Sequence, residues 1–194
     1  MIKSGSNIYL IGPMGSGKTT IGQRVAKRLK MDFADCDWNL EKQTGASINL
    51  IFDVEGESGF RKRESKMLKV LTSRHNVLVA TGGGAVLKEE NRELMNRTGL
   101  VVYLQTSVSQ QLQRLRLDRT RPLLQERDRR QKLTRLAAIR NPIYEQLADI
   151  VFPSCSRGPE ISARHLTEAI VSYREASSTP DTGIDRDSPS HGTV

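Results

Sequence analysis

The chain has 194 residues, 37% of them hydrophobic and 27% charged, with a formal net charge of +8 at pH 7. This length suits one compact domain with a substantial core, and no stretch approaches the roughly 20 apolar residues of a membrane span. Cys36 and Cys155 are the only cysteines, too few for a disulfide framework and without the spacing of a metal site. We therefore expect a soluble, cytoplasmic protein with free thiols.

Short apolar runs alternate with amphipathic stretches along the chain. The predicted strands are Ile8–Ile11, a short one near Phe33–Ala34, Val77–Ala80, Leu100–Leu104 and Ile150–Phe152. Helical patterns lie between them, for example in Ser65–Ser73, Glu89–Asn96 and Ser109–Leu117. This alternation predicts an α/β fold, a parallel sheet with helices on both faces. We expect one domain over residues 1–175, followed by a disordered tail at 176–194, which is almost without apolar residues.

The first predicted strand is followed by GPMGSGKT at residues 12–19, a full match to the phosphate-loop pattern G-x-x-x-x-G-K-[ST]. A helical stretch, Ile21–Leu29, comes next, which is the context that the motif requires. Its glycines let backbone N–H groups turn toward a phosphate, Lys18 can reach the β- and γ-phosphates, and the Thr19 hydroxyl can ligate Mg²⁺. An ordinary glycine turn is the alternative, but the motif in this context favours a nucleoside triphosphate site.

Asp35, Cys36 and Asp37 follow the second predicted strand, at the sheet edge where loops converge on ligands. Residues two apart on a strand share a face, so both carboxylates can point into one site. One would hold Mg²⁺ and the other would orient a substrate hydroxyl. A polar strand end or a helix cap is the alternative. The only tryptophan, Trp38, comes next and would either pack on the core or report on the substrate-binding segment.

Three consecutive glycines, Gly82–Gly84, follow the third predicted strand and Thr81. They are costly in backbone entropy unless a substrate lies against their N–H groups, and a flexible turn is the alternative reading. Arg61, in FRKRE at 60–64, begins a charged helix, and Arg140, in RNPIY at 140–144, stands beside a proline that would kink its helix or fix its approach. Two such arginines suit bidentate recognition of a carboxylate.

The positive charge is concentrated in residues 114–135, which hold nine Arg or Lys and three acids and so supply +6 of the net +8. In a nucleotide-binding enzyme, one local basic segment fits the phosphates of a small ligand better than a duplex backbone. The aromatic residues that interleave in single-strand binders are missing. We expect neither a nucleic-acid partner nor a membrane partner.

The ordered set of motifs, together with RPLL at 121–124, resembles the shikimate kinase family from Asn7 to about Tyr173. Many kinases share the phosphate loop alone, whereas the whole combination is far more specific. The resemblance implies a three-layer P-loop kinase fold around a five-stranded sheet, with a substrate-binding helical segment at about 37–64 and a mobile lid at about 115–127. It also implies transfer of phosphate from ATP to the 3-hydroxyl of shikimate, a step of chorismate and aromatic amino-acid biosynthesis.

The resemblance implies residue roles as well. ATP would be bound by Gly15, Ser16, Gly17, Lys18, Thr19, Thr20, Arg114, Arg121, Arg157 and Pro159. Shikimate would be bound by Asp37, Arg61, Gly83, Gly84 and Arg140. The catalytic residues would be Lys18, Asp37 and Arg121, and one Mg²⁺ would be held by Thr19 and Asp35. We expect a monomer. Two rivals stay open: another small-molecule P-loop kinase, of gluconate or nucleoside monophosphate type, and a non-catalytic ATP-binding module.

Overall fold

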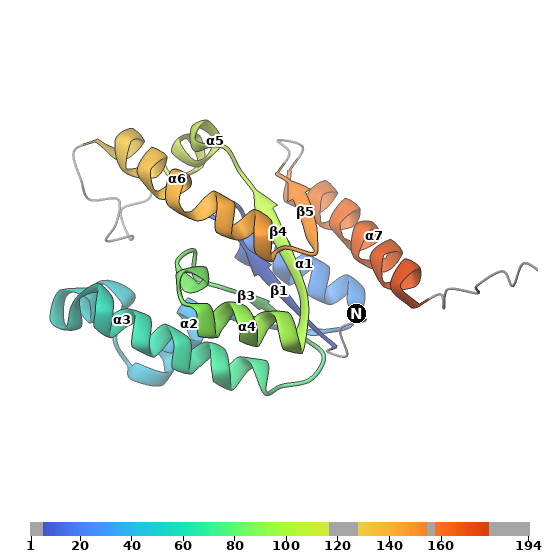
Figure 1. The fold of residues 1–194 in the computed structure, drawn as a ribbon, viewed down its shortest axis with the longest axis horizontal. Coiled ribbons are helices and arrows are strands. Elements are labelled where there is room, and N and C mark those ends of the chain that lie inside the picture. Colours follow the sequence, from blue (N-terminus) through green and yellow to red (C-terminus); the bar gives the residue numbers. More distant parts are fainter. Residues whose placement is uncertain (1–5, 117–127, 155–157, 179–194) are drawn as a thin grey trace, which may run out of the picture.

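The computed structural model describes residues 6–116, 128–154 and 158–178 (Figure 1). A five-stranded sheet in the order β2-β3-β1-β4-β5 forms its centre, and each neighbouring pair of strands is parallel. The strands are β1 (Asn7–Ile11), β2 (Asp32–Asp35), β3 (Val77–Ala80), β4 (Gly99–Gln105) and β5 (Ile150–Pro153). All five predicted strands are confirmed.

The central strands are almost entirely apolar, with polar residues only at the ends Asn7 and Gln105, because helices cover both faces of the sheet (Figure 1). Along β1, Ile8 and Leu10 face one layer, whereas Tyr9 and Ile11 face the other. The first layer consists of α1 (Lys18–Leu29) and α7 (Pro159–Ser178), and the second of α3 (Ile48–Thr72), α4 (Glu89–Thr98) and α6 (Arg129–Leu147). The predicted three-layer arrangement is therefore confirmed.

Strand β1 lies at the centre of the sheet, where the strand order reverses, and the loop after it opens at the carboxyl ends of the strands. The helix that follows packs directly on the sheet at Gly22. A Cβ atom at this position would lie 2.9 Å from side-chain atoms of both Leu10 and Phe33. This close contact fixes the beginning of α1, and with it the phosphate loop, against the sheet.

Helix α3 begins well before the charged segment at which we expected a helix to start. It runs from Ile48 and is interrupted at Gly56, whose φ of 67° and ψ of −178° are not helical. The FRKRE segment therefore lies inside α3, after this break. Helix α2 (Cys36–Thr44) packs against α3 through Leu40, Ile51 and Phe60, and the two helices extend to one side of the sheet in Figure 1.

Two further segments differ in extent from expectation. Helix α5 (Val108–Arg114) ends before the predicted Leu117, because Leu115 leaves the helix and is buried with Met14 and Leu133. Helix α7 continues to Ser178, past the predicted start of the tail at 176, and Ser177 Oγ donates to the Tyr173 carbonyl 2.8 Å away. Residues 117–127 of the predicted lid and 179–194 of the predicted tail lie outside the described part.

Two other features complete the fold. A short 3₁₀ helix, η1 (Ala85–Leu87), follows the glycine run, and α6 continues as one element through Pro142. Within the described ranges, no helix combines the length and apolar character needed to cross a bilayer.

Candidate active site

The loop between β1 and α1 adopts the conformation that its glycines permit. Gly12, Gly15 and Gly17 have φ values of 137°, 75° and 95°, in the region that side chains with a Cβ rarely occupy. A Cβ at Gly12 would also lie 2.8 Å from the Leu104 carbonyl oxygen. The loop leads into the N-terminus of α1, where the helix dipole and free N–H groups attract anions. This geometry is that of a phosphate cradle, not of an ordinary turn.

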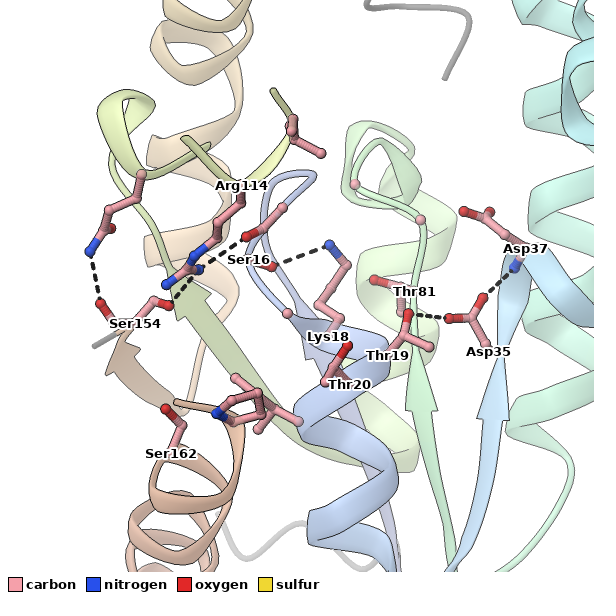
Figure 2. A pocket seen from close by; sticks show the side chains of 18 of the residues that line it. Ser16, Lys18, Thr19, Thr20, Asp35, Asp37, Thr81, Arg114, Ser154 and Ser162 are labelled. Carbon is pink, nitrogen blue, oxygen red and sulfur yellow. Dashed lines mark hydrogen bonds between the residues drawn. The ribbon is translucent and has the colours of Figure 1, made fainter. Parts of the chain in front are cut away.

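Lys18 is held above this loop. Its ammonium donates to the carbonyl oxygens of Gly12 and Pro13, both 2.8 Å away, and to Ser16 Oγ at 3.4 Å. Residues 15–20 line a pocket of about 600 Å³ that opens above the loop. Figure 2 shows Lys18 and Asp37 reaching into this pocket from α1 and α2. The lysine charge is thus aimed at the space where a polyphosphate would lie.

The two oxygens of the Asp35 carboxylate accept hydrogen bonds from different parts of the chain. Oδ2 accepts a 2.6 Å hydrogen bond from Thr19 Oγ1, while Oδ1 accepts from the backbone N–H groups of Asp37 and Trp38 at 2.9 and 3.3 Å (Figure 2). Asp35 therefore caps α2 and also reaches the phosphate loop. Our expectation that both carboxylates share one strand face is wrong, because Asp37 lies in the first turn of α2 and the helix cap brings it to the site.

The oxygens of Thr19 and Asp35 fit a divalent cation. The Thr19 hydroxyl donates its proton to Asp35. The lone pairs of the Thr19 oxygen therefore remain available to a ligand on the pocket side. Hydroxyl and carboxylate oxygens are ligands that Mg²⁺ prefers, and it is usually held by few protein groups together with water and phosphate. The described residues contain no group of three or more His, Cys, Asp or Glu able to hold a metal.

A second pocket of about 390 Å³ adjoins the first. Asp37, Gly82 and Gly83 line both pockets. The rest of the second lining comes from the phosphate loop, α2, both halves of α3, the glycine run and α6: Met14, Trp38, Glu41, Ile48, Phe52, Phe60, Arg61, Glu64, Gly84 and Arg140. Asp37 lies where the two pockets join. A group bound in the second pocket can therefore approach a phosphate bound in the first.

An ion pair packs against the glycine run. Arg61 Nη1 donates to Glu64 Oε2 at 2.7 Å, and the Glu64 side chain is only 2% exposed. Burial raises the pKa of the Glu64 carboxyl, and the charge of Arg61 only partly opposes this. A Cβ at Gly82 would lie 2.1 Å from Glu64 Oε1, and one at Gly84 would lie 2.3 Å from Arg61 Nη2. The glycines are therefore a steric requirement of the pocket, not a flexible turn.

The two arginines of the second pocket carry unused donors. Arg61 and Arg140 both line it, as expected, and Arg140 is 5% exposed. Within the described part of the chain, the Nε atoms of both side chains are buried without a hydrogen-bond partner. Buried charged donors are costly when unsatisfied, so an anionic group in this pocket would stabilise them.

The far end of the first pocket is built around Arg114. Its Nη1 donates to the Gly15 carbonyl at 3.0 Å and to Ser154 Oγ at 2.8 Å, so it joins the phosphate loop to the segment after β5 (Figure 2). Pro159, a predicted nucleotide contact, lines the same pocket. The predicted nucleotide contacts Arg121 and Arg157 lie outside the described residues.

Sequence reasoning missed several residues of the two pockets. Glu64 stood inside a charged run that is typical of a solvated helix face, although its i,i+3 spacing from Arg61 was a usable signal. Gly82 was left out of the predicted contacts although it lines both pockets. No sequence signal marked Ser154 or Ser162, because nothing local relates them to the loop that they face.

Trp38 does not pack on the core, so that alternative is wrong. Its side chain is 51% exposed, lines the second pocket and makes an edge-to-face contact with Phe33 at a centroid distance of 6.3 Å. Its neighbour Cys36 is buried, and burial, followed by the charges of Asp37, Glu64 and Asp35, raises the pKa of its thiol well above the usual value. The indole is the better probe of the site.

The fold and the two adjoining pockets define a P-loop kinase that acts on a small anionic molecule. Comparison with known proteins makes this specific. The family model described as shikimate kinase matches residues 14–171, and the chain belongs to the shikimate kinase family. It is 51% identical over 165 residues to the shikimate kinase of Pasteurella multocida (strain Pm70), covering 84% of this chain and 94% of that protein. For that of Haemophilus influenzae (strain PittEE), the identity is 48% over 165 residues, with coverages of 84% and 92%.

Solved structures of shikimate kinases have a similar fold. A shikimate kinase from Acinetobacter baumannii in complex with shikimate is 45% identical, with a TM-score of 0.84 over 88% of this chain and 95% of that one. A shikimate kinase from Bacteroides thetaiotaomicron is 34% identical, with a TM-score of 0.78 over 85% and 98%. A gluconokinase from Sinorhizobium meliloti has a TM-score of 0.50 at 18% identity over 88% and 98%, a likeness of fold alone. The family resemblance seen in the sequence is confirmed.

Proposed function

We infer that the protein transfers the γ-phosphoryl group of ATP to the 3-hydroxyl of shikimate, giving shikimate 3-phosphate and ADP on the route to chorismate and the aromatic amino acids. Family membership supports the identity of both substrates. The observation that carries the chemistry is the meeting of two pockets at Asp37, one built on a phosphate loop and one on two arginines with unused donors.

The proposed mechanism follows from the nature of phosphoryl transfer. The transition state is loose, so alignment and charge stabilisation provide most of the catalysis. Lys18 stabilises the charge that develops on the phosphate oxygens. Asp37 orients the attacking hydroxyl and accepts its proton late in the reaction. Thr19 and Asp35 would hold Mg²⁺, which would supply positive charge against the phosphates of ATP.

Substrate binding is assigned to the second pocket. Arg61 and Arg140 pair with the shikimate carboxylate, and the bare backbone of Gly83 and Gly84 lets the ring approach closely. The family resemblance assigns Arg121 to the transferring phosphate and Arg157 to the nucleoside, and both lie outside the described residues. Arg114 and Pro159, which line the first pocket, are assigned to the nucleoside as well. We propose a cytoplasmic monomer, since ATP is available there and one chain supplies both pockets.

The test is an ATP-consumption assay with and without shikimate, repeated with gluconate and with a nucleoside monophosphate as acceptors. We expect ADP release to be fast only with shikimate, and ³¹P NMR to detect a phosphate ester on its ring. Equal turnover with another acceptor would support the rival small-molecule kinase. ATP binding without any acceptor-dependent turnover would support the non-catalytic module.

Replacing either pocket arginine by lysine should weaken shikimate binding selectively. Arg61→Lys and Arg140→Lys keep the charge but lose the planar fork that matches a carboxylate. Loss of one charge-assisted hydrogen bond corresponds to a rise in the shikimate KM of roughly tenfold or more, with the KM for ATP little changed. Steady-state kinetics in both substrates measures this.

A shikimate analogue without the carboxylate is the control for the arginine variants. It should bind the wild type and both variants almost equally, because it offers nothing for the fork to hold. If the double variant still prefers shikimate to the analogue, the carboxylate is recognised elsewhere in the protein.

Trp38 emission should report shikimate binding. The half-exposed indole lines the substrate pocket beside Asp37, so bound shikimate changes its contact with water. Because the chain has one tryptophan, a fluorescence titration with shikimate should give a saturable change, and a Trp38→Phe variant should give none. A flat titration, under conditions where calorimetry detects binding, would place shikimate away from this segment.

A further inference from the structure

Tyr144 is a buried tyrosine behind the substrate pocket, with no exposed surface. It lies one helical turn after Arg140 on α6, and its ring stacks on that of Tyr103 at a centroid distance of 5.0 Å. Its hydroxyl donates a hydrogen bond to the carbonyl oxygen of Gly83. The ring itself does not line the pocket, so any effect on the substrate must pass through the groups that the hydroxyl contacts.

The hydroxyl connects two groups that are assigned to shikimate. On one side is the Gly83 carbonyl. On the other is Arg140: burial raises the pKa of the Tyr144 phenol far above its usual value, and the charge and hydrogen bonding of the neighbouring Arg140 offset part of this rise. The phenol is therefore protonated at any working pH and stays a donor to Gly83.

The Gly83 carbonyl belongs to the peptide unit that also contains the Gly84 N–H. In a trans peptide the carbonyl and the N–H lie in one plane and point in opposite directions. A hydroxyl that holds the carbonyl from the α6 side thus directs the Gly84 N–H away from α6. Gly83 is also close to the phosphate loop, because a Cβ there would lie 3.3 Å from the Gly12 carbonyl oxygen and 3.6 Å from the Tyr144 hydroxyl. Gly83 therefore packs closely against both groups, and the Tyr144 hydroxyl is hydrogen-bonded to its carbonyl.

We propose that Tyr144 is a positioning residue for shikimate, whose hydroxyl fixes the Gly83–Gly84 peptide and the Arg140 guanidinium in the orientation that binds the substrate. This rests on the proposed function, since it concerns the same pocket. The stacked partner, Tyr103, provides a matched control: its hydroxyl is buried without a hydrogen-bond partner among the described residues, and burial raises its pKa to about 12. Its ring belongs to the same stack, but among the described residues its hydroxyl makes no hydrogen bond to the pocket.

The experiment compares Tyr144→Phe with Tyr103→Phe. Each keeps the aromatic pair and removes one oxygen. Losing the hydrogen bond to Gly83, together with the interaction with Arg140, should raise the shikimate KM and Kd of Tyr144→Phe by at least roughly three- to tenfold, with the KM for ATP within about twofold of wild type. Tyr103→Phe should match wild type in all three constants. Calorimetry without ATP gives the Kd, and thermal melts verify that both variants are folded.

Three results would overturn the proposal: an unchanged shikimate KM in Tyr144→Phe, an equal change in both variants, or a rise in the KM for ATP as large as that for shikimate. The last two would mean that the tyrosine pair supports the fold in general. Wild-type turnover with shikimate tests the proposed function separately, so failure of one idea can be told from failure of the other.

Discussion

Lys18→Ala should abolish phosphoryl transfer and leave the fold intact. The lysine ammonium lies over the phosphate loop, where charge develops on the transferred group, and removing one such stabilising group typically costs about 10²- to 10³-fold in kcat. We expect a loss at the upper end of this range or beyond, because a full charge is removed. Turnover is measured by coupled ADP release with saturating substrates.

The fold should tolerate this change, because the Lys18 ammonium donates to the oxygens of Gly12, Pro13 and Ser16 in its own loop. Thermal unfolding is the control and should give a midpoint close to that of wild type. Near-normal turnover in a variant with an unchanged midpoint of thermal unfolding would show that Lys18 is not required for catalysis.

Asp37→Asn should reduce kcat by about 10²- to 10⁴-fold, the usual contribution of a positioned acid–base group. Asp37 lines both pockets, so the variant loses the charged partner of the shikimate hydroxyl where the substrates meet. Nucleotide affinity should change much less, because no phosphate contact is removed. Single-turnover kinetics and a separate ATP-binding titration distinguish these effects.

Asp35→Asn is the matched comparison, two residues earlier in the chain. Because Asp35 bonds to Thr19, we expect this variant to change the Mg²⁺ concentration needed for half-maximal activity. Asp37→Asn should keep the wild-type metal dependence. Identical Mg²⁺ titration curves for wild type and both variants would show that the proposed division of labour is wrong.

Much of the fold could be read from the sequence because its strands are short apolar runs buried on both faces. Such runs are local signals, and Leu100–Leu104 needed only to be recognised as too short for a buried helix. The extent of α3 could not be read in this way. Its first half packs mainly on α2, and the break at Gly56 lies in an acidic stretch without a clear period. Tertiary contacts decide such boundaries.

The phosphate-loop pocket and the second pocket also differed in how far local sequence signals predicted them. The phosphate loop is contiguous, so Gly15–Thr20 could be placed from the motif alone. The second pocket joins Arg61 and Arg140 from distant helices. Their residue type suited a shared carboxylate, but no local signal placed them side by side. Asp37 was assigned correctly to the pockets but for the wrong geometric reason, because a strand pattern does not show where a helix cap begins.

The contact between the glycine run and the Arg61–Glu64 pair restricts how this sequence can change. Any side chain at Gly82 or Gly84 would occupy space already filled by the ion pair. Truncating Arg61 or Glu64 to make room would leave the other charge buried without its partner, or would remove a proposed substrate contact. A side chain at Gly82 or Gly84 therefore requires the ion pair to move. A redesign of acceptor specificity through the glycine run has to include Arg61 and Glu64 as well.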